Sequence, residues 1–316
     1  MCNFPVFALR PRDGSKLVFG SIAKLQELER KRGDFYECIQ VECGRCMACR
    51  MSRARDWAVR CVMESKLHDK NSFVTLTYDN EHLPTGNTLV KRDLQLFMKR
   101  LRKKFGAGIR FFACGEYGTK YQRPHYHLLL FGFDFPDKVP WKSSKGAKFG
   151  HNFDNVIYRS AMLEDLWKFG FSTVGSVSYE SCSYVSRYIL KKQRGEKDEN
   201  SVYRKQNILP EFTVMSRKPG IARSFYDAFG ADLYEKDFIQ ISEKVRARLP
   251  RYFDNLFAAE HGIDTLESIK ANRLVKLELA QEKRPNEFTL QRRQAKEEVL
   301  KFNVKNRLIR AYENGD

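Results

Sequence analysis

Several common signatures are missing from this sequence, and each absence excludes a class of protein. The chain has no Gly-Lys dipeptide, so it contains no Walker A loop and does not hydrolyse ATP by the P-loop route. It has no His-Glu-x-x-His motif, which excludes the common zinc proteases. No run of about 18 apolar residues occurs, so no transmembrane helix is predicted.

A secretion signal is also missing. Residues 1–12 lack a basic region followed by an apolar core, as a signal peptide would require. We therefore expect a cytoplasmic protein. Its eight cysteines should then be reduced thiols or metal ligands, because disulfide frameworks belong to oxidising compartments.

The composition points to a folded protein with a polyanionic partner. The chain has 316 residues, enough for one large domain or two modest ones, and 42% hydrophobic and 13% aromatic residues, enough for a real core. Its formal charge is +18 and its pI about 9.5. Such a surplus indicates binding to nucleic acid or to an acidic membrane surface.

Two histidines stand one residue apart at the start of an apolar run. If this run is a strand, His125 and His127 lie on the same face and can chelate a metal. The preceding apolar segment, residues 109–117, is close enough to pair with it as an antiparallel strand, which would bring Glu116 in as a third ligand. Leu129 stands where histidine-triad hydrolases need another histidine, which excludes that class. The alternative is a pair of polar residues at a strand edge.

Two tyrosines stand four residues apart in a segment expected to be helical. Tyr184 and Tyr188 would then share one helix face, with Lys191 on the same side. A tyrosine with an ordinary pKa near 10 is a poor nucleophile, so it needs a cation or metal nearby. A metal can also polarise a phosphoryl oxygen. Together these residues suit transesterification of a phosphodiester, although an amphipathic helix burying two aromatic rings would show the same spacing.

The combination resembles the HUH endonucleases, with His125-Tyr126-His127 as the histidine motif and Tyr184-x-x-x-Tyr188 as the two-tyrosine motif. It is most similar to the replication initiators of microviruses, especially the gokushovirus group. Residues 73–78 match that family's first motif strand, and residues 217–221 match a further segment. The resemblance covers roughly residues 38–225. Tyr126 is bulkier and more polar than the aliphatic residue usual between the histidines.

This resemblance implies an α+β fold, an antiparallel sheet covered by helices, which also agrees with the expected order of strands and helices. It implies that His125, His127 and Glu116 bind Mg²⁺ or Mn²⁺; two nitrogens and one carboxylate suit Mn²⁺ better. We expect residues 1–68 to form a Cys-rich segment packed on a catalytic domain at residues 69–236. A helical C-terminal region would follow at residues 237–316.

The implied activity is rolling-circle initiation. One tyrosine attacks single-stranded or supercoiled viral DNA at the origin, which leaves a 5′-phosphotyrosine link and a free 3′-hydroxyl. A host DNA polymerase extends that hydroxyl, and a host helicase unwinds the duplex because this chain has no P-loop. The second tyrosine cleaves the regenerated origin, and rejoining releases circular single-stranded DNA. The resemblance places the protein in the cytoplasm of a bacterial host, with no membrane partner.

Basic residues supply the candidate DNA contacts. Residues 90–105 are predicted to form an amphipathic helix, and residues 91–104 carry seven Lys or Arg against Asp93 alone. A solvated face is the alternative for such a charge run. Arg123 lies between the two proposed metal-bearing strands and could grip the scissile phosphate. The full set of expected DNA contacts is Arg123, Arg187, Lys192, Lys99, Arg100 and Lys103.

A cluster of cysteines near the N-terminus has the gaps of a zinc site. Cys43, Cys46 and Cys49 are each separated by two residues, and Cys38 or Cys61 could be the fourth ligand. We take Cys38, Cys43, Cys46 and Cys49 as the expected set for a structural Zn²⁺. Buried free thiols are the alternative, because cysteine is among the most buried residue types.

The remaining pattern predicts further elements. Helices are expected over residues 22–31, 47–67, 159–169, 179–192 and 287–312, and strands over residues 72–78, 172–178 and 212–215. Residues 134–156 are expected to be a surface loop and residues 193–206 a mobile polar segment. No strand is expected after residue 237.

Two other functions share part of this pattern. A non-catalytic, zinc-stabilised basic protein that coats nucleic acid would explain the charge and the cysteines, but not the histidine and tyrosine spacings. Plasmid relaxases use the same chemistry, but they usually carry three histidines and an N-terminal tyrosine, which this chain lacks.

Overall fold

The computed structural model describes residues 2–13, 15–31, 33–118, 121–145, 154–191 and 202–308. Contacts within the chain divide it into two compact units. One unit combines the residues up to Ser52 with those from Asn272 onward, and the other is Arg53–Ala271. The larger unit contains the main sheet.

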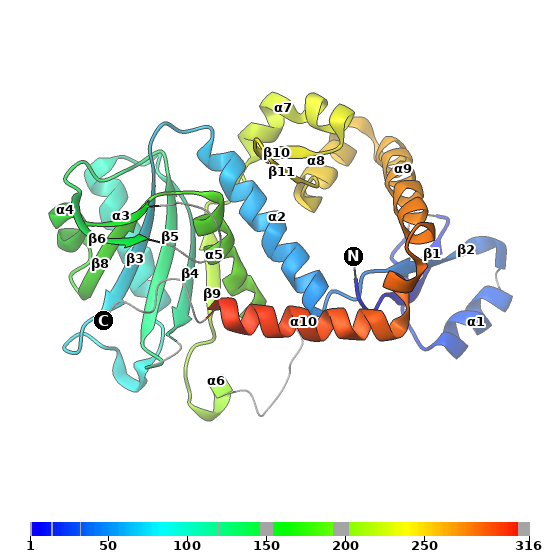
Figure 1. Cartoon of the computed structure of the whole chain (residues 1–316), viewed down its shortest axis with the longest axis horizontal. Coiled ribbons are helices and arrows are strands. Elements are labelled where there is room, and N and C mark those ends of the chain that lie inside the picture. Colours follow the sequence, from blue (N-terminus) through cyan, green and yellow to red (C-terminus); the bar gives the residue numbers. More distant parts are fainter. Residues whose placement is uncertain are drawn as a thin grey trace. The chain divides into compact units, whose positions relative to one another are not determined.

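The helices and strands follow one another along the whole chain (Figure 1). The α-helices are α1 (Ile22–Lys31), α2 (Met47–Ser65), α3 (Lys91–Phe105), α4 (Ala161–Leu166), α5 (Tyr179–Lys191), α6 (Val202–Lys205), α7 (Arg223–Lys236), α8 (Arg251–His261), α9 (Ile263–Glu282) and α10 (Leu290–Leu308). Short 3₁₀ turns are η1 (Gly33–Phe35), η2 (Thr85–Asn87) and η3 (Pro285–Phe288). The strands are β1 (Val6–Pro11), β2 (Tyr36–Val41), β3 (Asn71–Tyr78), β4 (Arg110–Tyr117), β5 (Pro124–Phe131), β6 (Val139–Lys145), β7 (Asp154–Arg159), β8 (Gly170–Gly175), β9 (Phe212–Met215), β10 (Ile239–Ser242) and β11 (Val245–Ala247).

The main sheet is antiparallel and has seven strands in the order β6-β7-β8-β3-β5-β4-β9. The predicted α+β class, with an antiparallel sheet covered by helices and a helical C-terminal extension, is therefore confirmed. Strands β3, β5 and β4 lie next to one another near the centre of the sheet, so their side chains are covered on both faces.

One face of the sheet packs on α3 and α4. Tyr126, Leu128 and Leu130 of β5 point to this face and are fully buried. The apolar stripe of α3 was expected from its helical spacing, and it covers them. The helix side chains in this core are Leu94, Phe97, Met98 and Leu101 of α3 with Leu163 and Leu166 of α4. Burying each such side chain contributes about 1.5–3 kcal/mol, so this core holds the central strands firmly in place.

The other face lies against α5 and the C-terminal part of α2. Because side chains alternate along a strand, His125 and His127 point to this second face. Here α5 contacts β4, β5 and β9. The ring of Trp57 on α2 lies 5.2 Å from that of Phe112 on β4. Figure 1 shows α5 on one side of the sheet and α3 and α4 on the other.

Two strand pairs correct the sequence predictions. Residues 134–156 were expected to be a loop, but β6 and β7 form a hairpin at the edge of the main sheet. The glycines and lysines that suggested a loop lie mainly at residues 146–153, outside the described residues, whereas Val139, Trp141 and Val156 are typical strand residues. The expectation of no strand after residue 237 is also wrong, because β10 and β11 pair across a tight turn.

The other predicted elements are confirmed with ends shifted by a few residues. These include the helices at residues 22–31, 47–67, 90–105, 159–169, 179–192 and 287–312 and the strands at residues 72–78, 109–117, 172–178 and 212–215. Most of the segment expected to be mobile, residues 192–201, lies outside the described residues. Among the described helices, none has the length and apolar character needed to cross a bilayer.

The smaller unit begins with a ribbon of two antiparallel strands. β1 and β2 pair from Val6↔Val41 to Pro11↔Tyr36. This register brings the start of the chain beside the residues that follow Val41, so Cys2 lies close to the cysteines near α2. The structure therefore corrects the expected zinc set, since Cys2 joins Cys43, Cys46 and Cys49 in place of Cys38. Cys38 is exposed on β2.

Candidate active site

Strand pairing alone brings three potential metal ligands together. Glu116 of β4 is directly opposite His125 of β5, and Cys114 is opposite His127. On the other side of β5, Thr75 of β3 is opposite His127. Since directly opposite side chains on one face lie about 4.5–5.5 Å apart at Cβ, the register places Glu116, His125, His127 and Thr75 in one group.

The polar atoms of this group converge on a small volume. Oε1 of Glu116 lies 3.0 Å from Nε2 of His125 and 2.8 Å from Nε2 of His127. Glu116 is fully buried, and the His127 side chain is only 3% exposed. A buried carboxylate is stable only when it is paired, so this group must be neutralised by protons or by a cation.

The outer ring nitrogens orient both imidazoles. Nδ1 of His125 lies 3.0 Å from the carbonyl oxygen of Arg123. A carbonyl only accepts, so this Nδ1 carries the proton and Nε2 presents its lone pair. Nδ1 of His127 lies 3.0 Å from Oγ1 of Thr75, which can accept in the same way. Such outer hydrogen bonds are the usual means of aiming histidine at a metal.

The distances fit a hard divalent cation. An octahedral ion with ligand distances of about 2.1 Å holds adjacent ligand atoms about 3.0 Å apart. The two Oε1–Nε2 distances have this length, and all three ligand atoms lie within 4.8 Å of one another. The donor set of two nitrogens and one carboxylate oxygen therefore fits Mg²⁺ or Mn²⁺.

The electrostatics of Glu116 favour a cation as well. Burial by itself would raise the pKa of this carboxyl group. The contacts with His125 and His127 outweigh burial and hold its pKa well below the usual range. Glu116 is therefore ionised at neutral pH and available as a ligand.

Tyr184 lies beside this group. Its hydroxyl oxygen is 3.4 Å from Nε2 of His127, its ring packs edge-on against that imidazole at 5.1 Å, and only 4% of the residue is exposed. The guanidinium carbon of Arg187 lies 5.9 Å from the Tyr184 ring. Tyr188 and Lys191 belong to the described backbone of α5, but their side chains lie outside the described part.

The other expected DNA contacts are scattered. Arg123 donates to the carbonyl oxygen of Tyr78 at 2.9 Å and to Oδ1 of Asn80 at 2.5 Å, so it fastens the end of β5 to the end of β3. Arg100 donates through Nε to the carbonyl oxygen of Leu166 at 2.9 Å, which ties α3 to α4. Lys192 lies outside the described residues.

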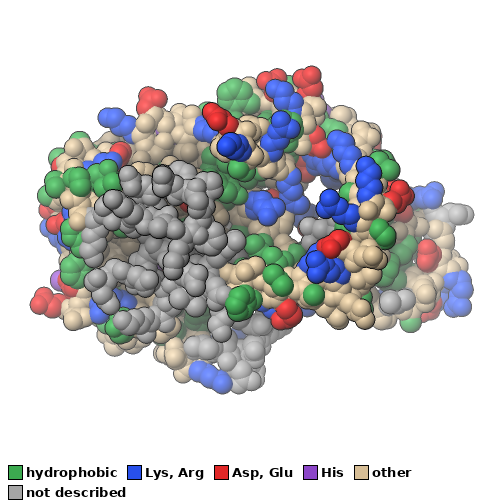
Figure 2. Space-filling view, viewed as in Figure 1, with side chains coloured by type: hydrophobic (Ala, Val, Ile, Leu, Met, Phe, Trp, Pro, Cys, Tyr) green, Lys and Arg blue, Asp and Glu red, His purple; other side chains and the backbone are tan. Residues whose placement is uncertain are grey.

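Lys99 and Lys103 are exposed on α3, which covers the sheet face opposite to His125 and His127. They are therefore not placed to touch a phosphate at the histidines. On the face drawn in Figure 2, the coloured lysines and arginines also stand in several separate groups, with acidic side chains between them. The positive charge of the chain is spread over its surface.

Two residues that support the site were not predicted. Thr75 holds Nδ1 of His127, and the ring of Phe73 stacks on that imidazole at 5.6 Å with an interplanar angle of 14°. The signal was available: in residues 73–77 every second side chain faces the histidines once β3 is paired with β5. The order of strands in the sheet was what the sequence pattern did not show.

Thr75→Val tests the orienting hydrogen bond. The variant keeps the size of the side chain and removes the hydroxyl, so His127 can turn and change its tautomer. We expect the affinity for Mn²⁺ to fall about 10–100-fold, as measured by titration calorimetry. Thr77→Val is the matched control, because it removes a hydroxyl from the same face of β3 without touching Nδ1 of His127. Equal Mn²⁺ affinities for the wild type and Thr75→Val would contradict this role.

The sequence is similar to known proteins over this region. Residues 71–193 match the model of a family of replication-associated proteins of the ORF2 type. Replication-associated protein VP4 of Bdellovibrio phage phiMH2K is 31% identical, over 76% of this chain and 74% of the relative. Replication-associated protein ORF2 of Spiroplasma virus 4 is 35% identical, over 70% of this chain and 68% of the relative. Replication-associated protein ORF4 of Chlamydia phage 1 is 37% identical over 48% of this chain. No solved structure matches the chain significantly.

Proposed function

This chain belongs to the same family of replication-associated proteins as these phage relatives, and on that premise we propose that it initiates rolling-circle replication of a phage genome. It nicks single-stranded DNA at the origin by tyrosine transesterification. It also rejoins the ends to release a circular single strand.

One observation carries this proposal. The Tyr184 hydroxyl is buried 3.4 Å from a histidine nitrogen that converges with a second histidine and a carboxylate. A phenol packed only for its apolar area has no need of this neighbour. A phenol that attacks phosphorus needs its negative charge stabilised and the phosphate oriented, and a cation at Glu116, His125 and His127 is near enough for both.

The chemical step conserves the number of phosphate ester bonds. The Tyr184 oxygen forms a bond to phosphorus while the bond from phosphorus to the 3′-oxygen breaks. The phenol loses a proton, and the leaving 3′-oxygen gains one. The products are a 5′-phosphotyrosine link and a free 3′-hydroxyl, so neither cleavage nor rejoining requires ATP.

Glu116, His125 and His127 would hold Mg²⁺ or Mn²⁺. When bound, this ion supplies charge that polarises the phosphate and stabilises the phenolate-like oxygen. Arg187 adds a fixed positive charge near the Tyr184 ring. Tyr188, one helical turn along α5, is proposed to make the second cleavage after one round of synthesis.

The partners follow from this reaction. The substrate is viral DNA at the origin, single-stranded or exposed by supercoiling. A host polymerase extends the 3′-hydroxyl and a host helicase unwinds the duplex, in the cytoplasm of the bacterial host.

A gel assay tests the proposed reaction. Purified protein, Mn²⁺ and labelled single-stranded DNA with the origin of its genome should give an adduct that survives boiling in detergent and is absent with EDTA. Peptide mass spectrometry should locate the nucleotide on Tyr184 or Tyr188. Salt-sensitive DNA binding without any adduct would instead support a non-catalytic nucleic-acid-binding protein.

A further inference from the structure

We propose that the smaller unit contains a tetrathiolate zinc site formed by Cys2, Cys43, Cys46 and Cys49. This site is separate from the proposed nicking centre, and the argument for it does not depend on that activity. It differs from the expectation based on spacing alone, because its fourth ligand comes from the start of the chain.

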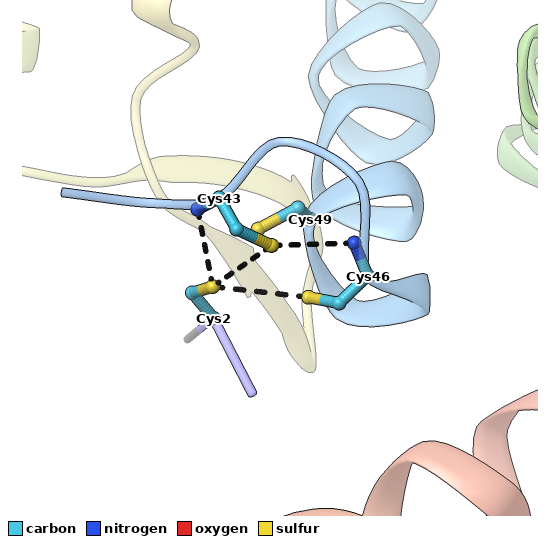
Figure 3. A group of neighbouring side chains, drawn as sticks. All are labelled: Cys2, Cys43, Cys46 and Cys49. Carbon is cyan, nitrogen blue, oxygen red and sulfur yellow. Dashed lines mark hydrogen bonds between the residues drawn. The ribbon is translucent and has the colours of Figure 1, made fainter. Parts of the chain in front are cut away.

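The sulfur positions fit one tetrahedral ion. A tetrahedral site with Zn–S bonds of about 2.3 Å holds its sulfurs about 3.8 Å apart. Sγ of Cys2 lies 3.5 Å from Sγ of Cys43 and 3.8 Å from Sγ of Cys46. All four sulfurs lie within 4.8 Å of one another. Figure 3 shows the four side chains pointing toward a common centre.

The fold assembles these ligands from separate segments. The β1–β2 ribbon carries Cys2 to the loop after β2, where Cys43 lies. Cys46 and Cys49 stand just before and within the first turn of α2, where the positive end of the helix favours thiolates. Backbone N–H groups of Cys43 and Cys46 each lie 3.3 Å from a cluster sulfur, that of Cys2 and that of Cys43 respectively. Such donors stabilise thiolates that carry more charge than one ion removes.

Other uses of four cysteines fit less well. Disulfides require sulfurs about 2.05 Å apart, whereas all four cysteines here are free. An iron–sulfur cluster is suggested by the two-residue gaps. However, the cysteines of a four-iron cube each bind a different iron, which places their sulfurs farther apart than in this group. A single ion accounts for four mutually close sulfurs.

Burial indicates a structural site. Cys2, Cys46 and Cys49 are each at most 7% exposed, and Cys43 is half-buried. Four protein ligands fill a tetrahedral ion, so no position is open for water or substrate. The site therefore serves the fold and not the chemistry.

A buried carboxylate extends this arrangement to the C-terminal helix. Glu297 of α10 accepts from Nδ2 of Asn3 at 2.7 Å and from the backbone N–H of Met47 at 2.6 Å. Asn3 follows one zinc ligand, and Met47 follows another. The ion would thus hold the two segments that Glu297 grips, and its loss should release α10 from the start of α2.

Metal analysis tests the site. Purified full-length protein, dialysed against Mg²⁺ buffer, should retain one zinc per chain. The His125→Ala/His127→Ala double variant removes the other metal site and should retain the same zinc. Cys2→Ser should lower zinc affinity at least about 100-fold, beyond the loss usual for an outer partner. Cys38→Ser, the matched control on β2, should leave zinc unchanged.

A second measurement covers a Cys2→Ser variant that does not fold. Co²⁺ added to the metal-stripped wild type should give the visible absorption of a tetrahedral tetrathiolate ion, and Zn²⁺ should abolish it. Stripping should also speed proteolysis at residues after Asn272. Wild-type protein without stoichiometric zinc and without the Co²⁺ bands would overturn the proposal. So would zinc that is lost with Cys38→Ser but kept with Cys2→Ser.

Discussion

Replacing both Tyr184 and Tyr188 by phenylalanine should lower formation of the covalent DNA adduct by about 1,000-fold or more, because the nucleophile is lost and water is a poor substitute. The measurement is a single-turnover time course on origin-containing single-stranded DNA with Mn²⁺, resolved on a denaturing gel. Both substitutions keep the aromatic ring. Packing against Phe73 and His127 is thus preserved, and DNA affinity by fluorescence anisotropy should be unchanged.

The single variants assign the order of cleavage. If Tyr184 attacks first, Tyr184→Phe should lose most of the initial adduct, whereas Tyr188→Phe should form it and fail to release circles. Tyr179→Phe removes a hydroxyl from the first residue of the same helix and should match the wild type. An adduct that persists in the double variant would show that another residue is the nucleophile.

The metal ligands were the part of the site most accessible from sequence. The two-residue period of a strand places His125 and His127 on one face whatever the surrounding fold. The short connection between residues 117 and 124 leaves little choice but an antiparallel pair, which sets Glu116 opposite His125. Local rules were sufficient because every step involves neighbours in sequence.

Contacts between distant segments were much less accessible. Cys2 and Cys43 are 41 residues apart, and they meet only because β1 pairs with β2. Neither strand has a strong sequence signal: Arg10, Glu37 and Gln40 interrupt the apolar positions. Cys38 looked suitable because it is near the other cysteines in sequence, yet its position on β2 takes it out of the group.

The basic helix shows the same limit. Its amphipathic pattern predicted α3 and its buried stripe correctly. Periodicity cannot say which face of a sheet a helix covers, and α3 covers the face without the histidines. Lys99 and Lys103 can therefore contribute to DNA binding only at a distance from the proposed cleavage site. Weakening of affinity without a change in cleavage rate is what their removal should produce.

Replacing both His125 and His127 by alanine should abolish metal-dependent nicking, with a fall of about 1,000-fold or more, because the cation loses two of three protein ligands. Mn²⁺ binding by calorimetry should disappear together with the adduct. His261→Ala, which removes an imidazole at the end of α8, is the control and should retain both. Unchanged nicking in the double variant would mean that the cation, if used, binds elsewhere.

Glu116→Gln separates loss of the ion from loss of the fold. The amide keeps the shape of the buried side chain and an oxygen that can reach His125 or His127, but it lacks the charge that attracts a cation. Mn²⁺ affinity should fall about 10–100-fold. Nicking should fall in parallel and recover as Mn²⁺ is raised, with the maximal rate close to that of the wild type. Recovery is not expected for the double histidine variant, because excess Mn²⁺ cannot restore two missing ligands.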